Sequence, residues 1–344
     1  VENSNGLSTM MDSLEPDRRR TLNFSQHGLG DGNTFGFWPM LIGGSFLYVS
    51  YYGCDQSQVQ RTLSTRNIDE SNQALFLNGL LRFPLVLLYC LVGVGIGAFA
   101  SQNPDFINSL PKVNGVTELN LAVPYFMITN LPNGLVGLSM VALFAAAMSS
   151  LDSVLNSLSA TTMEDFVTRF YPMMDWKDNT ELWCSRAITA VWGIITLVMS
   201  FFVGDIASTV LEAINQIGSM ANGSILAVFA LGLLTHRTNG NGAIMGLVTG
   251  ISVNASLWAF APLVSWLWWN VVGFFVTFVI GWGLSLVATP SSNLQPEYLQ
   301  NLRMANIFTG GYLAAEANID WSRRCVFMLA WFLTLLILLW MLGG

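Results

Sequence analysis

The chain is a succession of long apolar runs separated by shorter polar stretches. An α-helix rises about 1.5 Å per residue, so a run of roughly 20 apolar residues is long enough to cross the ~30 Å hydrocarbon core of a bilayer. Runs of this length predict an all-α integral membrane protein. We expect eight spanning helices, at residues 35–53, 74–100, 132–163, 184–204, 208–234, 241–260, 262–288 and 324–343.

The composition supports a membrane location and argues against several other classes of protein. Of the 344 residues, 53% are hydrophobic and 10% are charged, whereas about a quarter of the residues of soluble domains are charged. The net charge of −7 gives no reason to expect a nucleic-acid partner, and the four cysteines have neither metal-site nor disulfide spacing. Zinc-protease, serine-hydrolase, P-loop and dinucleotide-binding signatures are missing, so we expect neither enzymatic activity nor an organic cofactor.

The basic residues indicate how the chain is oriented, because Lys and Arg in short loops stay on the cytoplasmic side. If the first span runs from outside to inside, the connections that carry most of the Lys and Arg residues all fall on the cytoplasmic side. The partly apolar connection 101–131 predicts an extracellular cap that contains short helices. The resulting division is an extracellular loop segment at 1–34, a transmembrane core region with seven helices at 35–288, a cytoplasmic loop at 289–323 and a final transmembrane helix at 324–344.

The third expected span carries an unusual ladder of small and hydroxyl side chains. On a helix that turns about 100° per residue, these positions fall on one side and bring their oxygen atoms together. Oxygen atoms are the ligands that a hard cation such as sodium requires. Lipid chains offer these oxygen atoms no hydrogen-bond partner or ligand, so they are expected to face protein, water or an ion. Close helix packing and hydroxyl groups bonded back to their own helix are the structural alternatives. The ladder comprises Ala146, Ser149, Ser150, Ser153, Asn156 and Ser157.

Asp152 is the costliest side chain in the same span, because a carboxylate near the centre of a membrane helix is unfavourable by about 2.5–3.5 kcal/mol. It is expected either to add charge to a cation site or to take up a proton. A hydrogen bond to a neighbouring helix, or a position beside a water-filled vestibule, would also explain it.

Three further positions predict a solute pathway. Tyr48 and Tyr51 end the first span, and a tyrosine offers an apolar ring with a polar tip, which suits the wall of a solute cavity as well as a membrane interface. Asn215 lies among apolar residues of the fifth span, where Gly218 and Gly223 are expected to loosen the helix. Arg82, within the second span, is expected to extend towards the cytoplasmic interface.

Two stretches of the chain resemble the sodium/solute symporter family: YYGCDQSQVQRTLS at 51–64 and AAAMSSLDSVLNSLSATTMEDF at 145–166. A third, GSILAVFALGLL at 223–234, is consistent with it. The resemblance implies the second half of an inverted-repeat (five-plus-five, LeuT-like) transporter fold, followed by three trailing helices. The first helices of that fold are absent, and residues 1–34 have neither a start methionine nor a signal-peptide pattern, so we expect a piece of a longer transporter.

The resemblance also implies roles for particular residues. Sodium is expected to bind the Ala146 carbonyl and the hydroxyl groups of Ser149 and Ser150, with Asp152 and Ser153 as further candidates. The family's remaining ligands are carbonyl groups of a broken first helix, one of the missing amino-terminal helices that we expect as partners. Tyr48 and Asn215 fall at positions that contact sugar in sugar-carrying relatives, and Tyr51 falls at the gating aromatic position.

The function expected from these patterns is sodium-coupled symport of a small polar organic solute or anion by alternating access. Its partners would be the solute and the lipid bilayer, in the plasma membrane or, in a prokaryote, the bacterial inner membrane. Two alternatives stay open: a proton-coupled solute carrier that uses Asp152, and a membrane sensor of the same fold that does not transport.

Overall fold

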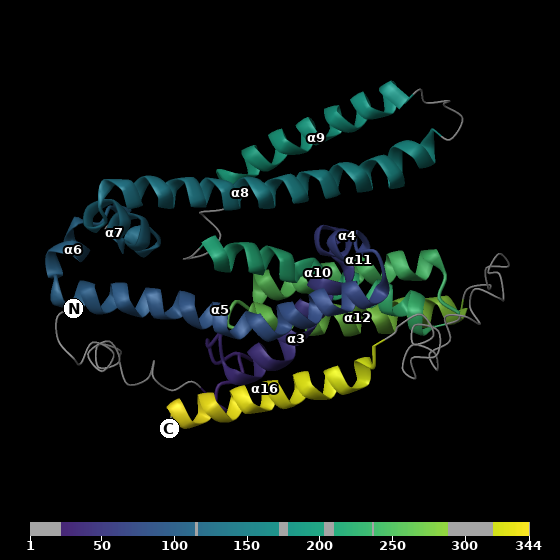
Figure 1. Cartoon of the computed structure of the whole chain (residues 1–344). Coiled ribbons are helices and arrows are strands. Elements are labelled where there is room, and N and C mark those ends of the chain that lie inside the picture. Colours follow the sequence, from purple (N-terminus) through teal and green to yellow (C-terminus); the bar gives the residue numbers. More distant parts are fainter. Residues whose placement is uncertain are drawn as a thin grey trace. The chain divides into compact units, whose positions relative to one another are not determined.

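The computed structural model describes residues 22–113, 116–171, 178–202, 210–235, 237–287 and 319–343, which are almost entirely helical. Seven of the described helices are long and apolar enough to cross a membrane (Figure 1). These helices are α5 (Ile68–Gln102), α8 (Asn133–Thr162), α9 (Asp178–Ser200), α10 (Val210–Leu234), α11 (Gly240–Phe260), α12 (Trp266–Val287) and α16 (Trp321–Gly343).

These seven helices confirm the helices expected at the last seven positions, with ends that shift by a few residues, and by length and composition each is a candidate span. The expected span 35–53 is shorter in the structure, which has a π-helix, η1 (Pro39–Gly43), followed directly by α3 (Gly44–Cys54). That this segment crosses the bilayer stays a prediction. Most of the two predicted loops, 1–34 and 289–323, lies outside the described residues.

Polar side chains fix where helices begin. Asp55 ends α3 and caps α4 (Gln56–Leu63), because its carboxylate accepts a hydrogen bond of 2.8 Å from the Ser57 N–H. The Asn67 amide oxygen accepts from the Glu70 N–H at 2.8 Å in the first turn of α5. Each bond satisfies a backbone donor that the first helical turn leaves without a partner.

The connection 101–131 folds into short elements, as its sequence predicts. They are α6 (Pro104–Ser109), a hairpin of β1 (Lys112–Val113) and β2 (Val116–Thr117), η2 (Leu119–Leu121) and α7 (Ala122–Asn130). An aromatic cluster holds this cap to the end of α5: the Phe99 ring centroid lies 5.1 Å from that of Phe126 and 5.5 Å from that of Phe106.

The structure divides into two compact units. The first contains the later part of α5, from Pro84, together with the cap, α8, η3 (Met163–Thr168) and α9. Within it α9 packs along α8 (Figure 1). The Ser159 hydroxyl donates to the Ser185 carbonyl at 2.9 Å, and the Trp192 indole N–H donates to the Thr162 hydroxyl at 3.0 Å.

The second unit contains η1, α3, α4, the first part of α5, α10, α11, α12 and α16. Its closest helix pair is α11 with α12, where glycine permits near contact of the two backbones. A Cβ atom on Gly246 would lie 2.5 Å from the Thr277 carbonyl oxygen, and one on Gly250 would lie 2.0 Å from the Thr277 hydroxyl. Gly242, Gly246 and Gly250 therefore form the contact face of α11.

Buried amides join α10 to this pair. Asn254 of α11 is fully buried and donates to the Met220 carbonyl at 2.9 Å and to the Trp269 carbonyl at 3.0 Å. Asn270 of α12 donates to the Ser219 hydroxyl of α10 at 3.0 Å. The predicted loosening of α10 at its glycines is wrong, because α10 is continuous and a Cβ atom on Gly223 would lie 1.9 Å from the Asn270 carbonyl oxygen.

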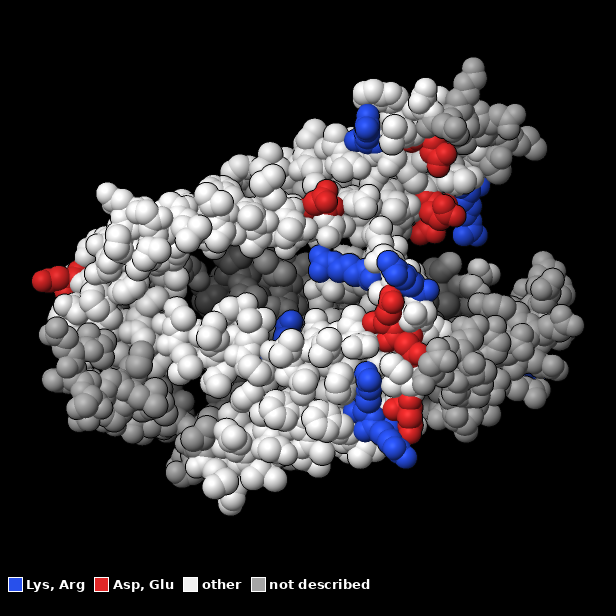
Figure 2. All heavy atoms as spheres, in the orientation of Figure 1, with Lys and Arg blue, Asp and Glu red and all other residues white. Residues whose placement is uncertain are grey.

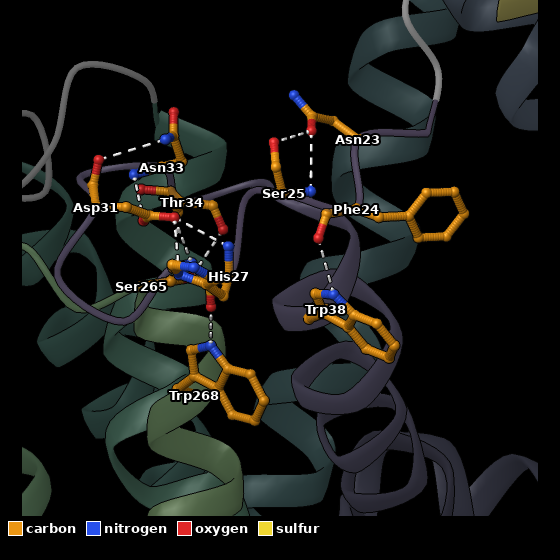
Figure 3. Close-up of polar contacts among 11 residues, drawn as sticks. Asn23, Phe24, Ser25, His27, Asp31, Asn33, Thr34, Trp38, Ser265 and Trp268 are labelled. Atoms are coloured by element: carbon orange, nitrogen blue, oxygen red, sulfur yellow. Dashed lines mark hydrogen bonds and ion pairs between the residues drawn. The ribbon is translucent and has the colours of Figure 1, made fainter. Parts of the chain in front are cut away.

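A glycine-rich loop before η1 caps the start of α12 (Figure 3). The Gly28 carbonyl accepts from the Ser265 N–H at 2.8 Å, and the His27 carbonyl accepts from the Trp268 indole at 2.7 Å. Asp31 closes the loop by accepting from the N–H groups of His27, Gly28 and Asn33. The chain turns there with positive φ at Gly28, Gly30 and Gly32, which favours glycine.

The outer surface of the described helices is largely apolar. Most of the face in Figure 2 is uncharged, and the charged side chains gather over a limited part of it. Large hydrophobic residues are exposed along α5, α8, α9 and α16. Such surfaces are expected where lipid or further helices replace water.

Candidate functional site

The oxygen ladder of α8 lies on a well-formed helix. Its hydroxyl groups bond along the helix: Ser149 donates to the Ala146 carbonyl at 3.0 Å, Ser153 to the Ser149 carbonyl at 3.3 Å and Ser157 to the Ser153 carbonyl at 2.8 Å. These bonds use the hydroxyl hydrogen atoms, and the Ser149 oxygen keeps its lone pairs as acceptors, whereas the Ala146 carbonyl also accepts the helical N–H of Ser150. The structure therefore contains the back-bonded arrangement, which is compatible with cation binding through the same oxygen atoms.

The Ala146 carbonyl and the Ser149 hydroxyl already have a spacing that suits a shared cation. Their oxygen atoms lie 3.0 Å apart, and two such atoms can both reach a hard cation at the usual ligand distance of about 2.3–2.6 Å. Ala146, Ser149 and Ser150 are exposed on α8. They can accept a ligand without displacing a side chain of their own unit.

The helix that packs on α8 contacts its opposite face. Leu155, Ser159 and Thr162 meet α9, and these positions lie about half a turn around the helix from the centre of the ladder at 100° per residue. The contact with α9 therefore leaves Ala146, Ser149 and Ser150 accessible. Close packing against α9 therefore does not explain why small and hydroxyl residues occupy these three positions.

Asp152 lies at the edge of the ladder. Its position is about 60° around the helix from Ser149, on the side towards the α9 contact. Its side chain is exposed, and among the described residues it has no ion pair. No group of three or more His, Cys, Asp or Glu side chains comes together in the described part of the chain, so the ladder is a set of neutral oxygen atoms with one carboxylate beside it.

The predicted solute pathway forms an aromatic cluster on α3. The rings of Tyr48 and Tyr52 stack with centroids 6.4 Å apart, and Tyr51 meets Tyr52 edge to face at 5.1 Å. The Tyr51 hydroxyl accepts from the Gln58 amide at 2.6 Å, which ties it to α4. The Tyr52 hydroxyl donates to the Asn78 amide oxygen of α5 at 3.0 Å.

Arg82 joins this cluster through a contact with Tyr48. Its guanidinium carbon lies 5.6 Å from the centroid of the Tyr48 ring. Tyr48 is seven residues before Asp55, where α3 ends, so this ring is about 10 Å of helical rise away from that end. The side chain therefore lies against a tyrosine of α3, and its expected extension towards the cytoplasmic interface stays a prediction.

Asn215 lies on α10, in the same unit as the cluster. It is partly buried near the start of α10, whereas the hydrogen bond between α3 and α10 joins the Ser50 hydroxyl to the Asn222 carbonyl at 2.8 Å. Sequence reasoning missed Asn78 and the pairing of Arg82 with Tyr48. Asn78 and Arg82 are four residues apart on α5 and therefore share one helix face, and this spacing was visible in the sequence.

A cavity of about 680 Å³ adjoins the cluster within the second unit. Tyr48 lines it together with residues of the glycine-rich segment, η1, α3 and α16, most of them apolar. Its polar lining side chains are those of Asn23, Gln26, Ser45 and Tyr48. This volume falls in the range of small-molecule sites, about 300–1,000 Å³.

Known proteins resemble the chain over most of its length. Residues 20–250 match the family model described as "Sodium:solute symporter family". The chain is 28% identical over 258 residues to human sodium-coupled monocarboxylate transporter 1, covering 74% of this chain and 40% of that protein. It is 28% identical over 247 residues to the sodium/sialic acid symporter NanT of Aliivibrio fischeri, covering 71% of this chain and 46% of that protein.

The sodium-dependent multivitamin transporter of Oryctolagus cuniculus is 29% identical over 297 residues, covering 83% of this chain and 43% of that protein. A solved structure of a substrate-bound, outward-open Na+-coupled sialic acid symporter has the same fold over part of its chain, with a TM-score of 0.61 at 23% identity. That match covers 74% of this chain and 51% of the other. The chain thus spans about half, or less, of the length of these relatives.

Proposed function

Because the chain belongs to the sodium:solute symporter family, a family of transporters and not of enzymes, we propose that it takes part in sodium-coupled symport of a small solute. Its described region would supply the second half of the inverted five-plus-five repeat and the three helices that follow it. The partners would be the solute, the bilayer and the amino-terminal helices of the same transporter, in the plasma membrane or the bacterial inner membrane.

The arrangement of oxygen atoms on α8 is the observation that supports sodium coupling. The Ala146 carbonyl and the Ser149 hydroxyl lie 3.0 Å apart on a face that α9 leaves uncovered. Ser150 is on the same side of the helix, so sodium would contact these three residues, with Ser153 and Asp152 as further candidates. Sodium is carried along its gradient here and is a co-transported substrate.

Coupling follows if sodium and solute prefer the same conformation. Sodium on α8 would favour the outward-open state and so raise the affinity for solute, with a coupling free energy of typically 1–3 kcal/mol. Tyr48, Tyr51 and Asn215 are the residues that we propose along the solute pathway. Alternating access would then carry both ligands from one side of the membrane to the other.

The test is solute uptake into proteoliposomes with an inward sodium gradient, an inward proton gradient, or neither. Sodium-dependent accumulation is expected, and Ser150→Ala should raise the sodium concentration for half-maximal uptake by at least tenfold. Ser139→Ala, a serine on α8 outside the ladder, is the matched control and should leave that concentration unchanged. Uptake that does not depend on sodium would contradict the proposal. So would a sodium concentration for half-maximal uptake that is the same in Ser150→Ala as in the unaltered protein.

A further inference from the structure

We propose that a cavity between the first turns of α5 and α16 binds a membrane phospholipid, with the lipid phosphate at Arg324 and the start of an acyl chain on the apolar side chains beyond it. The cavity has a volume of about 500 Å³ and lies within the second unit. The proposal goes beyond the symport and does not depend on it. The lining residues are Asn72, Leu75 and Phe76 of α5 and Trp321, Arg324, Cys325 and Met328 of α16.

The first turns of α5 and α16 lie at the same level. The Trp321 indole N–H, at the start of α16, donates to the Asp69 carboxylate at the start of α5 at 2.7 Å. Further along, a Cβ atom on Gly79 would lie 2.6 Å from the terminal methyl group of Met328. The two helices therefore run side by side from their first turns, with their polar ends together (Figure 1).

The lining of the cavity changes from polar to apolar along these helices. Arg324 and Asn72 lie nearest the helix starts. Leu75 and Phe76 follow Asn72 by about one turn, and Met328 lies about 6 Å of helical rise beyond Arg324. A phospholipid has the same order of groups over this distance, because its charged phosphate leads into hydrocarbon.

Arg324 supplies the donors that a phosphate requires. Its guanidinium carbon lies 4.8 Å from the ring centroid of Trp321 and 5.6 Å from that of Phe76. These aromatic rings contact the guanidinium and offer no oxygen atom to its N–H groups. In the described part of the chain no ion pair includes Arg324, so its N–H groups can donate to phosphate oxygen atoms.

The carboxylates near the cavity have other partners. Asp69 accepts from the Trp321 indole, and Asp320 pairs with Arg323 at 3.2 Å. Neither carboxylate belongs to the described residues that line the cavity, where Arg324 provides the charge. The complementary ligand group is therefore an anion, and basic pockets between spanning helices are typical sites for lipid head groups.

The surroundings favour a lipid over a soluble phosphate compound. Leu75 and Phe327 are exposed beside the cavity, and both helices are long and apolar enough to cross a membrane, so hydrocarbon is expected around them. A soluble phosphate compound would leave Phe76 and Met328 uncovered, whereas the acyl chain of a phospholipid covers them.

The test is protection of Cys325, which lines the cavity and is exposed. Its alkylation by N-ethylmaleimide in detergent is followed by peptide mass spectrometry, with Cys184, in the second turn of α9, as the internal control. Dioleoylphosphatidylglycerol is the probe, dioleoylglycerol lacks the phosphate, and glycerol phosphate lacks the chains. At about ten times its Kd, the phospholipid should slow alkylation of Cys325 about tenfold. The other two compounds should leave this rate unchanged.

Several outcomes of this experiment would overturn the proposal. Equal protection by dioleoylglycerol would show a site for chains alone, and protection by glycerol phosphate would show a site for soluble phosphates. Absence of protection by the phospholipid would show that it does not occupy the cavity. Equal protection of Cys184 would show a general effect of added lipid.

Variants assign the phosphate to Arg324. Arg324→Gln should raise the phospholipid concentration for half-maximal protection about ten- to hundredfold, as for loss of a charge-assisted hydrogen bond. Arg323→Gln is the matched control, because it removes the adjacent charge, which is exposed and paired with Asp320, and it should leave that concentration unchanged.

Arg324→Lys keeps the charge without the planar fork and should have an intermediate effect, so it tests the proposal even if Arg324→Gln does not fold. Native mass spectrometry gives a second readout: the unaltered protein and Arg323→Gln should retain one more phospholipid than the Arg324→Gln protein. Equal effects of the two glutamine variants, or protection that neither Arg324 variant alters, would overturn the assignment.

Discussion

At the level of single residues, the chemistry of α8 is set by its hydroxyl and carbonyl oxygen atoms. The Ser149 hydroxyl donates its hydrogen to the Ala146 carbonyl, so the Ser149 oxygen keeps its own electron pairs as acceptors, and sodium would replace this hydrogen bond at the Ala146 carbonyl. This could be anticipated from the spacing of small and hydroxyl residues. The environment of Arg82 could not be anticipated, because a sequence shows that a cation lies within an apolar run but not which aromatic ring of another helix it meets.

Asp152 provides a prediction that separates sodium coupling from proton coupling. Asp152→Asn removes the carboxylate and keeps the size of the side chain. If sodium is the coupling ion and binds the serine hydroxyl groups, uptake should persist and stay sodium-dependent, with a changed sodium affinity. Uptake driven by a pH gradient in the unaltered protein, and abolished in Asp152→Asn, would favour the proton-coupled carrier instead.

Asp31 provides a prediction about pH. Its pKa is lowered from the ordinary value, chiefly because the Asn33 N–H donates to the carboxylate, with further bonds from Gly28 and His27. A group with a depressed pKa in the folded state stabilises the fold above its unfolded pKa, about 3.9, and this contribution is lost as pH falls through the folded value. The protection of the Ser265 amide from exchange, relative to its intrinsic rate at each pH, should therefore fall below about pH 4, because this amide bonds the Gly28 carbonyl.

The matched variant is Asp31→Asn, which cannot ionise. Its Ser265 amide should be less protected than that of the unaltered protein at pH 6, and the further loss of protection on acidification should disappear. An Asp31→Asn protein with the same acid-dependent exchange at Ser265 would show that another group controls the loop.

At the level of elements, glycine spacing determines how closely α11 approaches α12. The contact face of α11 repeats every four residues, at Gly242, Gly246 and Gly250, and each would place a Cβ atom within 3 Å of an atom of α12. Hydropathy predicts both helices but cannot predict this pairing, because any two apolar helices satisfy the same criterion. The buried amides of Asn254 and Asn270 were likewise visible as polar residues, while their partners on α10 and α12 were not.

Gly246→Ala should therefore destabilise the second unit. Its Cβ atom would lie 2.5 Å from the Thr277 carbonyl oxygen, a backbone atom that cannot rotate away, and overpacking of this kind costs about 1–3 kcal/mol. Thermal unfolding in detergent should show a lower Tm for this variant. Gly283→Ala, on α12 with no atom within 4 Å of the added Cβ, is the control, and an equal Tm for the two variants would contradict the packing argument.

At the level of the whole molecule, the hydrophobic pattern predicts seven described helices of spanning length, and the family match explains their order. What the sequence cannot supply is the set of contacts across distant segments, such as Trp321 of α16 donating to Asp69 of α5 at 2.7 Å. The proposed transporter combines a sodium ladder in one unit with an aromatic and cationic cluster in the other. Each of these sites is built from residues of its own unit, so each can be tested by itself.

The central claim is that sodium binds the oxygen atoms of α8, and equilibrium binding of 22Na+ to the purified protein tests it most directly. The account predicts saturable binding that potassium does not displace. Binding should be lost in the double variant Ser149→Ala/Ser150→Ala and retained in Ser139→Ala. Saturable 22Na+ binding of unchanged affinity in the double variant would contradict the account.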